Sequence, residues 1–203
     1  QSPVSLVRIA CHINEFEDCL PAAIWLKDQG YKVGFNLMQI NNADEGKIAE
    51  LLKLANTHPI DVLYFADSMG SLNTQQITAI VNTFKNNWCG AIGIHAHDSM
   101  GNAVNNSMQA VNDGVSWVDC TVTGMGRGPG NAQTEYLSIE LDSYRKLNTS
   151  KTKLLKLIRN HFKPLKEQYD WGINPYYYLA GKHNIHPTYI QKMITDTRYN
   201  EED

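Results

Sequence analysis

Two histidines, His95 and His97, stand two positions apart at the end of a short run of small and apolar residues. On a strand, residues i and i+2 point to the same face, so both imidazoles can approach one point. Two imidazoles with a carboxylate or carbonyl oxygen suit a divalent ion such as Mn²⁺, Mg²⁺, Fe²⁺ or Zn²⁺. The pair can equally be two ordinary hydrogen-bonded strand histidines, but Asp98, which follows directly, favours the metal.

Other polar residues follow apolar runs at the corresponding point of each run. They are His12, Gln39 and Asn41, Asp67 and Ser68, and Asp119 and Thr121. The active site of a parallel α/β sheet lies at the carboxyl ends of its strands. We therefore expect these side chains to gather at the same end of a sheet as the histidine pair.

A glycine-rich segment covers residues 124–130 and holds four glycines in seven positions. It does not fit the dinucleotide-binding pattern Gly-x-Gly-x-x-Gly, because Pro129 or Asn131 stands where the third glycine is required. We expect the glycines to let the backbone bend closely over a small ligand. A plain tight turn is the alternative, although it does not require four glycines.

The elements that must position these residues repeat along the chain. Five strands are predicted, at Val4–Ala10, Lys32–Met38, Asp61–Ala66, Ala91–His97 and Trp117–Val122. Successive strands begin 26 to 30 residues apart, the length of one βα unit. Helical patterns follow at residues 19–29, 44–58, 73–85, 101–113, 132–147 and 151–168. Alternating strands and helices of this kind predict a parallel α/β sheet with right-handed crossovers.

The organisation predicted along the chain is a barrel-type portion followed by a helical extension. Residues 1–145 form the first, which carries the candidate site, and residues 146–203 form the second, which packs on it. The extension ends in an aromatic tail with three consecutive tyrosines, Tyr176–Tyr178. No flexible linker separates the two parts.

The composition excludes several classes of protein. With 203 residues, 42% hydrophobic and 19% charged, the chain is neither disordered nor collagenous, and its apolar runs are too short to span a membrane. A net charge of −3 gives no basic surface for nucleic acid. The chain begins without a signal-peptide pattern. Four cysteines without a Cys-x-x-Cys motif indicate reduced thiols, a cytoplasmic protein and no structural zinc.

Two long stretches carry a family resemblance. Residues 93–107 and 118–132 resemble the signature motifs of the HMG-CoA-lyase-like (DRE-TIM) metal-dependent aldolases, and residues 7–12 and 64–70 are similar to corresponding strands. Within that superfamily, the resemblance is greatest to the 4-hydroxy-2-oxovalerate aldolases. It implies a TIM barrel, of which this chain supplies the five βα units that match strands four to eight. The first three strands, with an Arg-Asp pair and a catalytic histidine, have no counterpart here, so the chain is either a fragment or a natural short form.

The resemblance also implies roles for particular residues. His95, His97 and Asn131 are expected to bind the metal, Mn²⁺ or Mg²⁺ in preference to Zn²⁺. Ser68 is expected to meet the substrate carboxylate, and Asp67 and Gly126 are further substrate-binding candidates. His12 and Tyr178 are candidates for catalysis. Each of these last two has a plainer alternative, because strand-end histidines often only support ligands and tyrosine clusters usually pack.

The activity implied is cleavage or formation of a 4-hydroxy-2-oxo acid through a pyruvate enolate stabilised by the metal, with a general base for the 4-hydroxyl proton. Residues 124–131 lack the catalytic cysteine of HMG-CoA lyase, which excludes that activity. A Claisen-condensing acyltransferase of the isopropylmalate synthase type is a second hypothesis. A non-catalytic module with the same fold is a third.

The expected ligand is a small 2-oxo acid, and the expected protein partner is a second copy of the chain or an amino-terminal segment. Binding to nucleic acid or to a membrane is not expected. An open barrel leaves unpaired backbone groups on its first and last strands. We therefore expect a homo-oligomer or association with an amino-terminal segment.

Overall fold

The computed structural model describes residues 3–145 and 150–198, which form two compact units. The first unit comprises residues 1–68, 72–95 and 109–119, and the second comprises residues 69–71, 96–108 and 120–203, apart from those not described. The chain passes between the two units several times.

A five-stranded sheet forms the centre of the first unit. Its strands are β1 (Leu6–His12), β2 (Lys32–Met38), β3 (Val62–Asp67), β4 (Ala91–Ala96) and β5 (Trp117–Val118). They lie in chain order, each hydrogen-bonded to its sequence neighbour, and β1–β2, β2–β3 and β4–β5 are parallel. A doubly wound sheet would reverse its strand order, whereas a barrel keeps it. The predicted parallel α/β fold with barrel order is confirmed.

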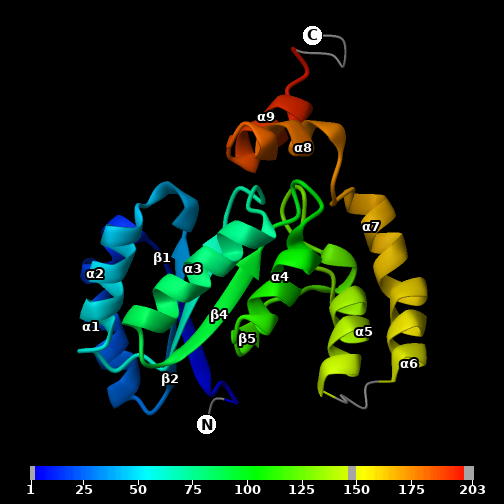
Figure 1. Ribbon diagram of the computed structural model, residues 1–203. Coiled ribbons are helices and arrows are strands. Elements are labelled where there is room, and N and C mark those ends of the chain that lie inside the picture. Colours follow the sequence, from blue (N-terminus) through cyan, green and yellow to red (C-terminus); the bar gives the residue numbers. More distant parts are fainter. Residues whose placement is uncertain (1–2, 146–149, 199–203) are drawn as a thin grey trace. The chain divides into compact units, whose positions relative to one another are not determined.

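Helices α1 (Phe16–Asp28), α2 (Glu45–Ala55) and α3 (Thr74–Asn87) flank the sheet of the first unit (Figure 1). Each begins or ends where the sequence provides a capping group. Asp44 accepts a hydrogen bond from the Lys47 amide at the start of α2, and Asn73 does the same for Gln76 at the start of α3. Gly30 follows α1 with φ +85°, the left-handed conformation expected of it.

Alternate residues of β2 show how the sheet divides its two faces. Val33, Phe35 and Leu37 are completely buried, and the Phe35 ring lies 5.0 Å from that of Phe16 in α1. Gly34 and Asn36 lie on the opposite face of the sheet, where they pair in register with Arg8 and Ala10 of β1. One face of the sheet is therefore mainly apolar core, and the opposite face carries Arg8, Asn36 and Tyr64.

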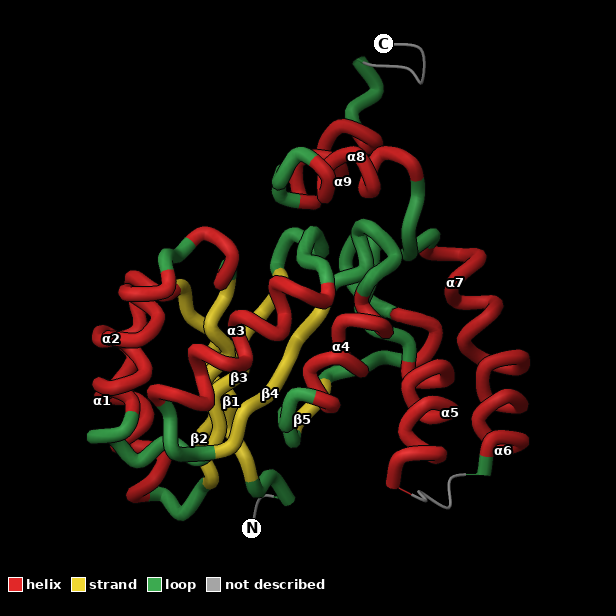
Figure 2. Tube along the Cα trace, viewed as in Figure 1, coloured by secondary structure: helices red, strands yellow, loops and turns green. Residues whose placement is uncertain are grey.

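The second unit is mainly helical (Figure 2). Its helices are α5 (Thr134–Arg145), α6 (Lys151–Leu157), α7 (Lys163–Tyr169), α8 (Pro175–Lys182) and α9 (Pro187–Thr195), and α4 (Ala103–Asn112) runs from this unit into the first. A π-helical turn at Ile158–Phe162 joins α6 to α7, so the predicted helix at 151–168 is present with a bulge in its middle. The predicted end of the preceding helix, Leu147, lies outside the described residues.

Two strands end earlier than the sequence pattern predicts. β5 has two residues instead of the six of Trp117–Val122, because Thr121 donates its amide to the carbonyl of Ala132, and a 3-10 turn follows at Val122–Gly124. β4 ends at Ala96, and His97 instead forms an isolated antiparallel bridge with Asn131. Local alternation of apolar residues cannot reveal that a loop replaces the neighbouring strand as hydrogen-bond partner.

All four cysteines are free thiols, and they differ in exposure. Cys11 is buried in β1, where burial and then its neighbour Cys19 raise its pKa to about 12. Cys89 and Cys120 are exposed. In the part of the chain that the structure describes, no helix is long and apolar enough to cross a membrane.

Candidate active site

Arg8, His95 and Asp119 meet on the polar face of the sheet. The Asp119 carboxylate oxygen Oδ2 lies 2.6 Å from Arg8 Nη1 and 2.8 Å from His95 Nδ1. Burial alone would raise the pKa of Asp119, but the hydrogen bond from His95 and the charge of Arg8 lower it below its ordinary value. Asp119 is therefore an ionised carboxylate at neutral pH.

The ring of Tyr64, in β3, packs against the Arg8 guanidinium. The Arg8 guanidinium carbon lies 4.3 Å from the centre of the Tyr64 ring, a cation–π contact. A side chain at Gly93 would collide with this ring, since a Cβ there would lie 2.3 Å from it. Trp117 contacts the ring edge-on, with ring centres 6.5 Å apart. Burial raises the pKa of Tyr64, with the Asp119 charge as the second cause.

The contact between Arg8 and Asp119 shows that the sheet is strongly curved. Arg8 lies on β1 and Asp119 directly follows β5, so four strand spacings separate them, about 19 Å in a flat sheet. An arginine side chain cannot span that distance to make a 2.6 Å contact. The sheet must curl around its polar face, as the wall of a barrel does.

Asp67 ends β3 and Ser68 follows it, and the two side chains differ in what they contact. The Ser68 hydroxyl accepts a hydrogen bond of 2.9 Å from the Gln39 amide, at the end of β2. The Asp67 carboxylate is fully buried and accepts the amide of Leu72 at 3.1 Å. Both residues lie at the carboxyl end of β3, as the strand pattern predicts, and the bond to Leu72 also fixes the loop that follows.

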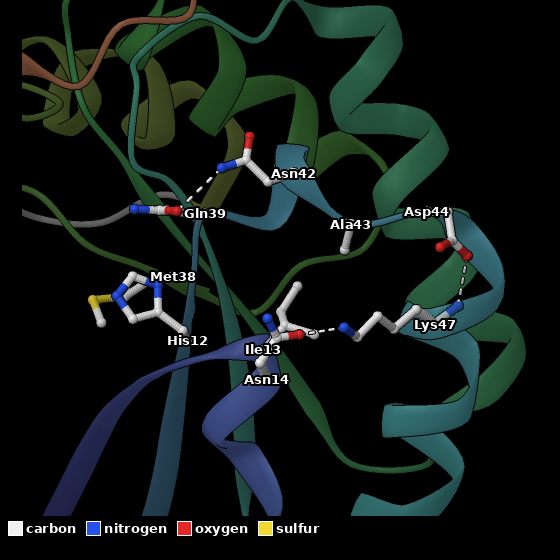
Figure 3. Close-up of a pocket in the computed structure, with 9 residues that line it drawn as sticks. All are labelled: His12, Ile13, Asn14, Met38, Gln39, Asn42, Ala43, Asp44 and Lys47. Atoms are coloured by element: carbon white, nitrogen blue, oxygen red, sulfur yellow. Dashed lines mark hydrogen bonds between the residues drawn. The ribbon is translucent and has the colours of Figure 1, made fainter.

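A pocket of about 270 Å³ opens at the carboxyl ends of β1 and β2 (Figure 3). His12 and Met38 lie together at one side of it, while Asp44 and Lys47 lie at the other. The Lys47 ammonium donates to the side-chain oxygen of Asn14. The predicted catalytic candidate His12 therefore lines a polar pocket.

The glycine loop of the second unit holds Asn131 beside His97. Asn131 Nδ2 donates to the carbonyl of Met125 at 3.1 Å, and a side chain at Gly126 would lie 2.4 Å from that nitrogen. Asn131 Oδ1 is buried and has no hydrogen-bond partner among the described residues. A buried acceptor without a donor is costly unless a cation or an added donor satisfies it.

The carboxyl-terminal tail packs on the same loop. Trp171 donates its indole N–H to the carbonyl of Thr123 at 3.1 Å, and the Gly172 amide bonds to the carbonyl of Gly128. The Tyr177 ring covers Gly128, where a side chain would come within 3.2 Å of it. Tyr177 is buried, whereas the predicted candidate Tyr178 is 44% exposed.

The predicted metal ligands offer nitrogen and amide oxygen atoms. No group of three or more His, Cys, Asp or Glu side chains that could hold a metal is present within residues 3–145 and 150–198. The predicted ligands, His95, His97 and Asn131, do not form such a group, because the third ligand is an amide oxygen. That oxygen is buried and has no donor in the described part of the chain, which fits a ligand to a divalent cation.

A parallel sheet in barrel order, with imidazole, carboxylate and hydroxyl groups on its polar face, defines an α/β-barrel enzyme domain. Residues 7–161 match the family described as HMGL-like. The chain belongs to the HMGL-like family, an enzyme family of lyases and aldolases.

Curated relatives carry the name 4-hydroxy-2-oxovalerate aldolase. The protein of Pelotomaculum thermopropionicum is 35% identical over 137 residues, which cover 68% of this chain and 40% of the relative. That of Brevibacillus brevis is 33% identical over 139 residues, 68% of this chain and 41% of the relative. The chain thus spans about two fifths of the length of these relatives.

Solved structures share the fold. The N-terminal domain of a “putative aldolase” from Bacteroides vulgatus superimposes with a TM-score of 0.87 at 30% identity, covering 96% of this chain and 65% of that one. Bacillus subtilis HMG-CoA lyase gives a TM-score of 0.70 at 17% identity, covering 88% of this chain and 68% of the lyase, and supports the fold alone. The fold is that of a partial α/β barrel.

Sequence reasoning missed three contributors to these sites. Arg8 lay within a family-like strand but was given no role, and neither Trp171 nor Tyr177 was connected with the glycine loop. Alternation along β1 was the available signal for Arg8, because it shares a face with His12. For the tail, the sequence contained no comparable signal.

Proposed function

We propose that this chain carries the metal- and substrate-binding part of a divalent-metal-dependent aldolase that cleaves or forms a 4-hydroxy-2-oxo acid. The observation that carries the proposal is the buried, unsatisfied amide oxygen of Asn131 beside His97, in a chain of the HMGL-like family. His95, His97 and Asn131 would hold the ion, with Mn²⁺ or Mg²⁺ preferred. The assignment of His95 to the same ion rests on the two-residue spacing of the histidines.

Each residue has a defined task in this proposal. The bound ion supplies Lewis-acid polarisation of the 2-oxo group. The Ser68 hydroxyl binds the substrate carboxylate, and Asp67 and Gly126 are further substrate-binding residues. His12 or Tyr178 manages the proton of the 4-hydroxyl, which a base must remove before the carbon–carbon bond breaks. Pyruvate is the product common to all such substrates.

Metal-dependent pyruvate binding tests the proposal. Mn²⁺ is titrated into the chain while the relaxation rate of water protons is measured, and pyruvate is then added. We expect one saturable Mn²⁺ site, and pyruvate binding that disappears when EDTA removes the ion. Absence of a saturable site, or pyruvate binding that is indifferent to Mn²⁺, would contradict the proposal and favour a non-catalytic module.

Ser68→Ala is expected to weaken Mn²⁺-dependent pyruvate binding by roughly tenfold, the effect of losing one hydrogen bond to a charged group. In a catalytically complete enzyme it should raise KM more than it lowers kcat, because the bond is present in ground and transition states alike. Ser71→Ala is the matched control, since the Ser71 hydroxyl contacts Asn184. Unchanged pyruvate affinity in Ser68→Ala would remove Ser68 from the site.

We also infer that the protein associates through its sheet edges. β1 and β5 are the edge strands of the described sheet, and neither contains a proline that would block pairing. Sedimentation at micromolar concentration is expected to give a species heavier than the 22.9 kDa chain. The added mass would come from a second copy of the chain or from a separately supplied amino-terminal segment. A stable, well-folded monomer would contradict the inference.

The free thiols fit a reducing compartment, and we place the protein in the cytoplasm.

A further inference from the structure

We infer that Asp119, anchored by Arg8, is the positioning residue that sets the ring of His95 for metal binding. The inference deepens the metal centre proposed above and rests on it. The contacts that support the inference all lie within the first unit. One oxygen of Asp119 accepts from both Arg8 and His95. The Arg8 guanidinium stacks on the Tyr64 ring, and Gly93 leaves room for that ring.

The shared oxygen determines which nitrogen of His95 carries the proton. Oδ2 of Asp119 is already an acceptor for the Arg8 guanidinium, which can only donate, so we assign the 2.8 Å contact with His95 to a proton on Nδ1 of the imidazole. In the neutral ring, Nε2 then carries the lone pair. A carboxylate that holds the far nitrogen of a metal-binding histidine fixes its tautomer and orientation, and raises its basicity as a ligand.

Arg8 fixes Asp119 in turn. Its Nη1 lies 2.6 Å from the same oxygen that accepts from His95, so the carboxylate cannot rotate without losing both bonds. The guanidinium is itself held over the ring of Tyr64, a buried side chain that Gly93 allows to lie against β4. A lysine could supply the charge but not the flat stack and the forked donor.

A purely structural role is the alternative, because the Arg8–Asp119 ion pair also ties β1 to the end of β5. The Lys27–Asp61 pair supplies a matched control for that role. Both oxygens of Asp61 lie 2.9 Å from Lys27 Nζ, and Oδ2 also accepts the amide of Val33. It is an ion pair of the same unit that contacts neither His95 nor Asp119.

The test uses the whole chain labelled with ¹⁵N in its histidine rings. Long-range ¹H–¹⁵N spectra of the metal-free protein identify the protonated nitrogen of His95, which is assigned by its loss in His95→Gln. Calorimetry then measures Mn²⁺ affinity. We expect Nδ1 to carry the proton in the parent and Asp119→Ala to move it toward Nε2. We expect Asp119→Ala to weaken Mn²⁺ binding 10- to 100-fold, the usual effect of losing such a support.

Three further variants separate the explanations. Asp119→Asn keeps an acceptor of the same shape, so it should retain the Nδ1 proton and lose less Mn²⁺ affinity than Asp119→Ala. Arg8→Ala should weaken Mn²⁺ binding less than Asp119→Ala, because the bond from His95 to Asp119 remains. Asp61→Ala should lower the unfolding midpoint and leave both the His95 spectrum and the Mn²⁺ affinity unchanged.

The outcomes distinguish this inference from the proposed function. A parent chain without saturable Mn²⁺ binding would overturn the metal centre itself. A parent chain that binds Mn²⁺, with an Asp119→Ala variant of equal affinity and unchanged His95 tautomer, would overturn only the role of Asp119. If Asp119→Ala does not fold, the Mn²⁺ affinities of Asp119→Asn and Arg8→Ala decide, and parent-like affinity in both variants would overturn the inference.

Discussion

His95→Ala and His97→Ala are each expected to abolish saturable Mn²⁺ binding while changing the free energy of unfolding by no more than about 1 kcal/mol. The reason is that His95 lies near the end of β4 on its polar face, opposite the apolar core of the first unit, and that His97 follows the strand in an isolated bridge with Asn131. Calorimetric Mn²⁺ titration and urea unfolding of each variant check the two halves of the expectation.

His161→Ala is the control for the histidine variants. It removes an exposed imidazole from the π-helical turn at Ile158–Phe162 and should bind Mn²⁺ like the parent. Parent-like Mn²⁺ affinity in both His95→Ala and His97→Ala would show that the metal assignment is wrong. A large loss of stability in either variant would mean that the histidine serves the fold.

Gly130→Ala is expected to have the largest effect of any single methyl group added to the glycine loop. Gly130 has φ +79°, and a Cβ there would lie 2.2 Å from the carbonyl oxygen of Gly124, so the backbone must move. The left-handed conformation costs roughly 1–2 kcal/mol and the overpacking about 1–3 kcal/mol more. Because Asn131 is the next residue, we also expect Mn²⁺ binding to weaken at least tenfold, as for other supports of a metal ligand.

Gly30→Ala separates the two costs of the Gly130 substitution. Gly30 has φ +85°, but a Cβ there meets nothing within 4 Å, so only the conformational cost applies. Chemical unfolding should therefore show a loss of about 1–2 kcal/mol for Gly30→Ala, and a greater loss for Gly130→Ala. Equal losses, with Mn²⁺ affinity intact in both variants, would contradict the assigned role of the loop.

The elements of the first unit could be predicted because their signals are local. Lys32–Met38 is a strand with the predicted bounds, since alternate residues face the helices and are buried. Asp44 and Asn73 begin helices as expected, because each cap is made within a few residues of sequence. β5 was overestimated because its length depends on a loop residue, Ala132, that competes for the amide of Thr121.

The site was predicted less completely for the same physical reason. The spacing of His95 and His97 is visible in the sequence, but the contact of Arg8 with Asp119 exists only because the sheet curls. The choice between Tyr177 and Tyr178 depends on which side of α8 meets Gly128, which the sequence alone could not decide. The catalytic, substrate-binding and metal-binding roles all stay predictions, for His12, Tyr178, Ser68, Asp67, Gly126, His95, His97 and Asn131.

The alternation within β2 has a consequence for how such a protein can evolve. Phe35 and its neighbours on the apolar face secure the fold, while Asn36, one position away, faces the polar side. A change at Asn36 alters the polar face, on which we propose that the substrate binds, without removing a side chain from the apolar face. Selection can therefore act on chemistry and on stability through separate sets of positions in the same seven residues.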